Sequence, residues 1–152
     1  MRDDNYLAEK LYYLWENFFV DVPRKNVVII KFGKKSYRQL GCITWAKTNT
    51  RGVKNLLRNL NEDYDDKRIS LINITGYFKD EEIPDKVVMG TIAHEMVHYS
   101  HGFHSPLQQL YDHPHKGGII RKEMVKRDLK DVYDYSKRWL KMNWASYIKT
   151  RR

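Results

Sequence analysis

The chain has a single cysteine, Cys42, among its 152 residues. A lone cysteine excludes an internal disulfide and a cysteine-rich zinc ribbon, and it is typical of proteins from a reducing compartment. The densest aliphatic run, at residues 27–30, is far too short to span a bilayer. The first ten residues carry acidic side chains where a signal peptide would be basic and then apolar. These absences predict a soluble intracellular protein, in the cytoplasm or in the nucleoid or nucleus, without membrane contact.

Charge is unevenly distributed along the chain, whose formal net charge is +9. Residues 121–152 contain 11 Lys/Arg and 4 Asp/Glu, a net of +7, whereas residues 61–85 contain 3 Lys/Arg and 8 Asp/Glu, a net of −5. A basic segment can bind DNA by releasing counterions from phosphates, and it can equally be a solvated helix face. The candidates for nucleic-acid contact are Lys137, Arg138, Lys141, Lys149, Arg151 and Arg152.

The hydrophobic pattern predicts one α+β domain over residues 1–152, because no repeat, low-complexity segment or long linker divides the chain. A turn at 33–36 predicts that the second strand pairs back on the first. Helices are expected over 5–20, 49–60, 85–101 and about 118–148, the last with a break near Asn143, and strands over 26–32, 37–46 and 68–74.

Residues 91–104, TIAHEMVHYSHGFH, contain four of the six histidines and the pattern H-E-x-x-H. Between a predicted N-cap at Asp85 and a stop at Gly102, this segment is expected to be helical. Residues four apart share a helix face, so His94 and His98 can converge on one zinc ion. Glu95 is turned about 100° away and can take a proton from a metal-activated water. The alternative is a core helix whose two histidines make only polar contacts.

A catalytic zinc needs a third protein ligand, and the spacing leaves several residues open. His104 stands at the metzincin distance, but that pattern requires glycine at 101, and here the glycine follows one residue late. His115 and Glu123 lie near the start of the next predicted helix. His101 and His113 are neighbours of these positions that could also bind.

Several stretches resemble the SprT-like metalloproteases, the family that includes the Spartan proteases. The likeness runs from about Val27 to Asn143 and rests on these matches: Arg38, Leu40, Gly41 and Ile43 as R-x-L-G-x-I, the strand RISLIN, Pro84, Asp85 and Val87 before H-E-x-x-H, then His115, Gly117 and Ile119, and the basic segment DVYDYSKRWLKMN. Lys116 and Ile119 depart from the glycine and the aromatic residue usual in the family, and the cysteine-rich zinc ribbon of many members is missing.

The resemblance implies a zincin-like fold: a small, mostly antiparallel sheet with an N-terminal helix, the H-E-x-x-H helix and a long C-terminal helix. It also implies that His94, His98 and His115 bind Zn²⁺ and that Glu95 is the general base. The activity implied is endopeptidase action on protein substrates, including proteins bound or crosslinked to DNA. The rival hypothesis is a non-catalytic, basic nucleic-acid-binding module with a structural zinc.

Four further side chains have expected places. Tyr99 and Tyr111 could stabilise an oxyanion, although packing is the commoner role of tyrosine. Asn73 on the third strand could line a substrate cleft. Cys42 is expected to be a small buried residue of the second strand.

Overall fold

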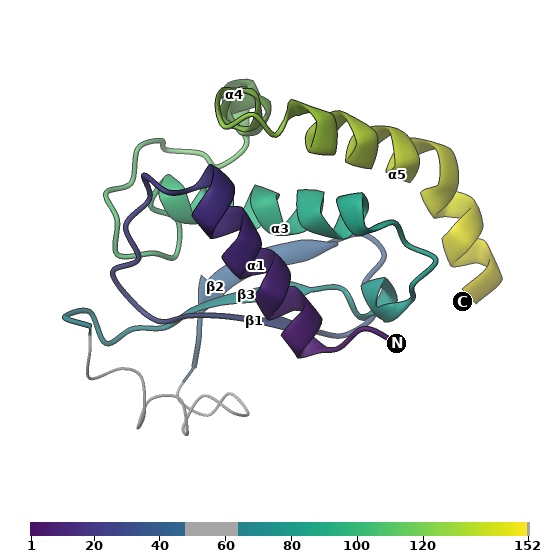
Figure 1. The fold of residues 1–152 in the computed structure, drawn as a ribbon, viewed down its shortest axis with the longest axis horizontal. Helices are drawn as coiled ribbons and strands as arrows, with labels where there is room; N and C mark the ends of the chain where they lie inside the picture. Colours follow the sequence, from purple (N-terminus) through teal and green to yellow (C-terminus); the bar gives the residue numbers. More distant parts are fainter. Residues whose placement is uncertain (48–63, 152) are drawn as a thin grey trace.

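The computed structural model describes residues 1–47 and 64–151, and the short helix predicted at 49–60 lies outside them. Within these residues the chain is an α+β domain with a three-stranded mixed sheet (Figure 1). Its elements are α1 (Asp4–Phe18), β1 (Val28–Phe32), β2 (Gly41–Trp45), β3 (Ser70–Ile74), the 3₁₀ helix η2 (Gly76–Lys79), α3 (Asp85–Ser100), the 3₁₀ helix η3 (Lys116–Gly118), α4 (Ile119–Lys126) and α5 (Lys130–Arg151).

The sheet has the order β1-β3-β2, which corrects the predicted pairing of the first two strands. β3 lies in the centre, parallel to β1 and antiparallel to β2, so the sheet is mixed rather than mostly antiparallel. The connection after β1 is not a tight hairpin, because it crosses the end of β3. There Gly76 and Thr75 donate backbone hydrogen bonds to the carbonyls of Lys34 (3.0 Å) and Leu40 (2.8 Å).

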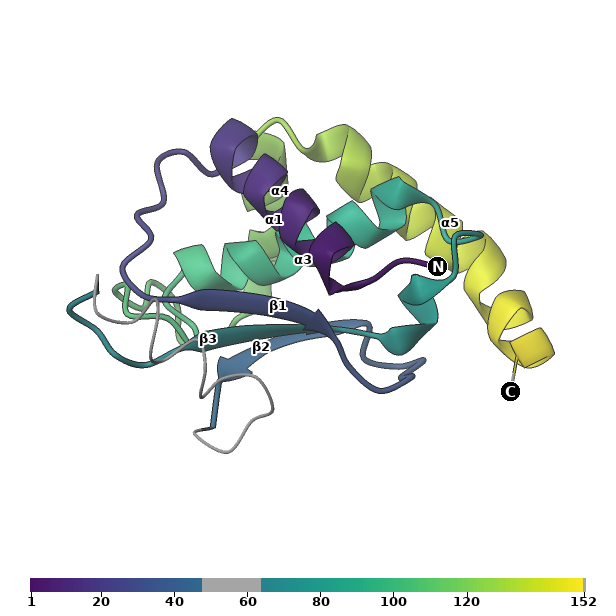
Figure 2. The same cartoon turned by 60° about the horizontal axis from the view of Figure 1, so that its bottom comes forward.

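α1 begins where Asp3 accepts a hydrogen bond from the backbone N–H of Tyr6, which satisfies one of the unpaired donors of the first turn. Its buried side chains, Leu7, Leu11 and Leu14, follow helical spacing and face the sheet and α3. Figure 2 shows α1 and α3 together over one face of the three strands.

α3 is buried on most of its circumference because it lies between the sheet, α1 and the C-terminal helices. It starts at Asp85 with Pro84 in the N-cap position, one residue before the predicted cap. It ends at Ser100, and the predicted stop, Gly102, follows the C-cap residue His101 with a φ of +86° that suits glycine. Gly102 and Phe103 donate to the carbonyls of Tyr99 and His98, and these two bonds close the last turn.

The predicted long C-terminal helix is two helices, and the break falls at Asp128 rather than near Asn143. Asp128 has a φ of +63°, and its N–H donates to Val125 O while Leu129 donates to Met124 O. This hydrogen-bond pattern ends α4 and turns the chain into α5. α5 then packs along α3, with Trp139 against the core.

The buried arginine Arg2 fixes the start of the chain beside the entry to α3. Its guanidinium donates to the carbonyls of Phe78 (3.1 Å), Asp80 (3.0 Å) and Ile83 (2.6 Å). It also pairs with Asp85 at 3.1 Å. In the part of the chain that the structure describes, no helix combines the length and the apolar character needed to cross a membrane.

Candidate metal centre

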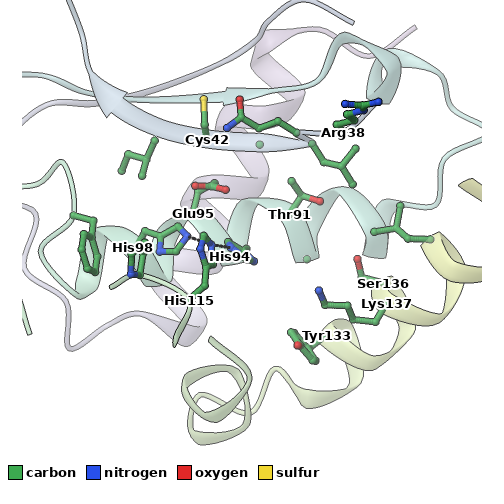
Figure 3. Close-up of a pocket in the computed structure, with 18 of the residues that line it drawn as sticks. Arg38, Cys42, Thr91, His94, Glu95, His98, His115, Tyr133, Ser136 and Lys137 are labelled. Carbon is green, nitrogen blue, oxygen red and sulfur yellow. Dashed lines mark hydrogen bonds between the residues drawn. The ribbon is translucent and has the colours of Figure 1, made fainter. Parts of the chain in front are cut away.

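A cleft of about 530 Å³ opens between β2 and the helices α3 and α5 (Figure 3). β2 and the residues before it form one wall, α3 forms the floor, and α5 forms the opposite wall. The segments around Phe103 and His115 close one end. Because β2 is an edge strand among the described strands, an extended peptide could lie beside it in this cleft.

Three histidines meet at the floor of the cleft. The Nε2 atom of His115 lies 3.1 Å from Nε2 of His94 and 3.0 Å from Nε2 of His98. The ligand atoms of all three lie within 4.8 Å of one another, which is close enough to hold a metal ion. No other group of three or more such ligands occurs within residues 1–47 and 64–151.

Each histidine reaches this point for a separate structural reason. His94 and His98 project from successive turns of α3, and their ring centroids are 4.7 Å apart. His115 comes from the loop that precedes α4. The ring of Phe103 packs edge-on against His98 at 6.1 Å and lies on the same side of the cleft.

The electrostatics of the site keep two of these histidines neutral. Burial is the main reason that the pKa of His94 falls to about 4 and that of His98 to about 3, and the neighbouring imidazoles add to both shifts. A neutral imidazole keeps a lone pair on one ring nitrogen, and metals bind that lone pair. His94 and His98 are therefore in the protonation state that metal binding needs at neutral pH.

Glu95 lies on α3 beside the histidines and is only 5% exposed. Burial raises its pKa to about 8, and a cation on the histidines would lower that pKa again by favouring the carboxylate. β2 passes directly over this side chain at Gly41. A Cβ at position 41 would lie 2.9 Å from Thr91 Cγ2 and 3.3 Å from Glu95 Oε1, so glycine permits the close approach.

Of the candidates for a third ligand, only His115 joins His94 and His98. His104 lines the cleft, but its ring faces Trp45 with centroids 6.4 Å apart. His101 is buried, and its Nε2 atom lies 3.5 Å from Glu123 Oε1, so these two ligand candidates contact each other instead of the metal group. The His101 ring also packs against Tyr111. His113 is exposed and belongs to no such group.

The other predicted side chains separate into packing residues and cleft residues. Tyr99 is 1% exposed and donates to Asn26 Oδ1 at 2.7 Å, so its hydroxyl serves the core. Cys42 is half-buried and lines the cleft. Asn73 is not among the residues that line the cleft; it lines a smaller hollow that shares Cys42 with the cleft.

The predicted nucleic-acid contacts do not form one group. Lys137 lines the cleft, and Arg151 pairs with Asp80 and Glu82 while stacking on Tyr147. Trp144 and Tyr147, which lie between these cations in the sequence, pack on Phe78 and Tyr77, respectively. The other three predicted contacts on α5, Arg138, Lys141 and Lys149, are exposed and do not line the cleft, and Arg152 lies outside the described residues.

Sequence reasoning did not identify the residues that shape the cleft away from the histidines. They come from β2 and the segment before it, from α3 and from α5, which the chain brings together only on folding: Arg38, Gly41, Thr91, Tyr133 and Ser136. Gly41 was noted in the R-x-L-G-x-I stretch, but its closeness to Glu95 could not be inferred from the pattern.

Comparison of the chain with protein-family models, curated proteins and solved structures finds no match.

Proposed function

We propose that the chain is a zinc-dependent endopeptidase of the zincin type, with His94, His98 and His115 as the zinc ligands and Glu95 as the general base. The observation that carries the proposal is the convergence of three imidazoles and a buried carboxylate on the floor of one open cleft. Catalytic zinc sites combine three protein ligands with a free position.

The donor set suits zinc. Tetrahedral zinc with Zn–N bonds of about 2.0–2.1 Å holds its nitrogens roughly 3.3–3.4 Å apart. The measured separations from His115 Nε2, 3.1 and 3.0 Å, lie close to that spacing. A zinc ion bound there would supply a Lewis acid that polarises the substrate carbonyl and acidifies water.

The residues of the chain supply the remaining steps. Glu95 accepts a proton from the attacking water and passes it to the departing amine, and its burial gives it a high proton affinity. Among the described strands β2 is an edge strand, so its backbone groups can hold an extended substrate across the cleft. This edge gives a peptide a binding site that a purely structural zinc centre would not need.

The rival function, a nucleic-acid-binding module with a structural zinc, predicts a closed site with four protein ligands. Among the described residues only three converge, which favours the enzyme. The resemblance to SprT-like proteases extends the proposal to substrates bound to DNA. Arg138, Lys141 and Lys149 on the exposed side of α5 are the cations best placed for such contact.

The variant Glu95→Gln tests the enzyme proposal. We expect it to keep about one zinc per chain, because the ligands are unchanged, and to lose cleavage of an unfolded protein by at least about 10²–10⁴-fold. Zinc is measured by mass spectrometry of the purified protein, and cleavage with and without added DNA.

The rival gains if wild-type protein carries one zinc and cuts no substrate under either condition. Loss of zinc from Glu95→Gln would contradict the proposal differently, because it would make Glu95 a ligand rather than a base.

A further inference from the structure

Two cations line the cleft beyond the histidines. Arg38 comes from the segment before β2, and Lys137 comes from α5, so they stand on opposite walls. In Figure 3 both lie toward the end of the cleft marked by Thr91, away from His98. The wall between them is partly apolar and includes Leu40 and Leu140.

Close packing of two helices fixes Lys137 in this position. α5 approaches α3 so tightly that a Cβ on Gly90 would lie 2.9 Å from Ser136 Cβ. Ser136 is buried in this contact, and Lys137 follows it along the rim of the cleft. The Lys137 ammonium lies 5.5 Å from the centre of the Tyr133 ring, and its charge acts on His94.

Neither cation has an acidic partner among the residues that the structure describes. Lys130, seven residues earlier on α5, pairs with Asp134 at 2.6 Å, so this helix does form ion pairs where a carboxylate is present. Among the described residues, the only acidic one that lines the cleft is Glu95, which the proposed mechanism uses. This end of the cleft therefore has positive charge without internal compensation.

We propose that this end of the cleft is a subsite for an acidic side chain, Asp or Glu, of a peptide substrate, with Lys137 as its main determinant and Arg38 as the second cation. The proposal rests on the proposed function, because the occupant is the peptide that the enzyme would cut. Leu40 and Leu140 would contact the methylene groups of a glutamate while the carboxylate meets the cations.

The position favours a peptide carboxylate over the phosphates of a nucleic acid. Lys137 and Arg38 line opposite walls of a recess of about 530 Å³ that also contains the three histidines and is bordered by β2, an edge strand among the described strands. A recess of this size suits a few side chains, whereas nucleic acids are commonly bound by a charged groove that follows the backbone. The exposed cations Arg138, Lys141 and Lys149 lie outside the cleft lining.

The test uses matched fluorescent peptides that differ only in having Glu, Gln or Lys near the bond to be cut. Binding is measured with the Glu95→Gln variant, so that hydrolysis is not needed, and kcat/KM with the wild-type enzyme. We expect the Glu peptide to bind about threefold to tenfold more tightly than the Gln peptide. Lys137→Glu should reverse this order in favour of the Lys peptide, and Arg38→Gln should weaken it.

The matched control is Lys122→Glu, an identical charge change at an exposed position of α4 outside the cleft. The control should keep the preference for Glu. Equal loss of the Glu preference in Lys122→Glu and Lys137→Glu would overturn the subsite, because net charge alone would then explain the preference. Equal binding of all three peptides by the wild-type cleft would overturn it as well. If Lys137→Glu bound a single-stranded oligonucleotide more weakly but kept the wild-type peptide preference, Lys137 would be assigned to phosphate. This result would also overturn the proposal. Selective binding without any hydrolysis by the wild type would preserve the subsite and contradict the endopeptidase function instead.

Discussion

At the scale of single residues, the proposed metal site depends on His115, the one ligand that α3 does not provide. Its Nε2 atom is the atom that lies within 3.1 Å of both other histidines. We expect His115→Ala to lower zinc affinity by more than about 100-fold, beyond the tenfold to 100-fold typical of losing a residue that only supports a ligand. Zinc content after dialysis against a competing chelator measures this.

Two other histidines of the same region provide matched controls for His115. His104→Ala and His113→Ala remove imidazoles that lie outside the group of three, so both should keep the metal. Loss of zinc from His104→Ala with retention in His115→Ala would show that the loop around His115 rearranges when metal binds.

The part of the site that could be predicted from sequence is the part that one helix builds. Regular geometry places His94 and His98 on one face and Glu95 beside them, so spacing alone was sufficient. His115 follows an irregular loop without any period, and it was selected only through the resemblance to a family. Arg38 and Lys137 could not be assigned to the cleft, because their neighbourhood arises from packing between distant segments.

At the scale of elements, hydrophobic spacing predicted the three strands and the helices α1 and α3 within a few residues. Spacing does not state which strands are neighbours, and the sheet order was predicted wrongly for that reason. β3 is buried along almost its whole length, as expected of a central strand, whereas β1 and β2 alternate more. Such a difference in burial becomes visible only once the helices cover the sheet.

The break between α4 and α5 gives a prediction on stability. Asp128 has a φ of +63°, a conformation that costs a non-glycine residue roughly 1–2 kcal/mol, less for Asp than for most. Asp128→Gly should therefore raise the free energy of unfolding by roughly 0.5–1 kcal/mol, despite the greater freedom of glycine in the unfolded chain. The midpoint of urea unfolding measures this, with an unchanged slope.

The opposite change at the same position supplies the control. Asp128→Val should destabilise the protein, because a β-branched side chain strongly disfavours positive φ. Met124 and Leu129, which flank the turn, are fully buried, so the turn must form even in the strained variant. Equal effects of Gly and Val would show that the backbone conformation at Asp128 does not limit stability.

At the scale of the whole molecule, α3 is both the centre of the core and the floor of the cleft. Val88, Ile92 and Met96 bury its apolar side, while His94, Glu95 and His98 on the same helix line the cleft. A ligand that binds only the folded chain raises its stability, so a metal ion held by His94 and His98 would couple metal binding to folding through this helix.

Two tyrosines should make the folded state sensitive to alkali. Burial raises the pKa of Tyr99 to about 12, and burial together with a hydrogen bond to Asp80 raises the pKa of Tyr147 to about 12. Because the ordinary pKa of tyrosine is about 10, the unfolded chain releases these protons first as pH rises. Their contribution to stability is complete below pH 10 and is lost between about pH 10 and 12. The melting temperature should therefore fall steeply over that interval.

Tyr99→Phe separates this effect from a general alkaline loss of stability. Removing the hydroxyl leaves the buried Asn26 Oδ1 without its donor, so the variant should be less stable by about 1–3 kcal/mol at neutral pH. It should nevertheless lose stability less steeply above pH 10, because one buried ionisable group is gone. Tyr13→Phe, at an exposed position of α1, should follow the wild-type curve. If Tyr99→Phe kept the wild-type steepness, alkaline unfolding would be driven elsewhere, by the lysines that maintain the positive net charge.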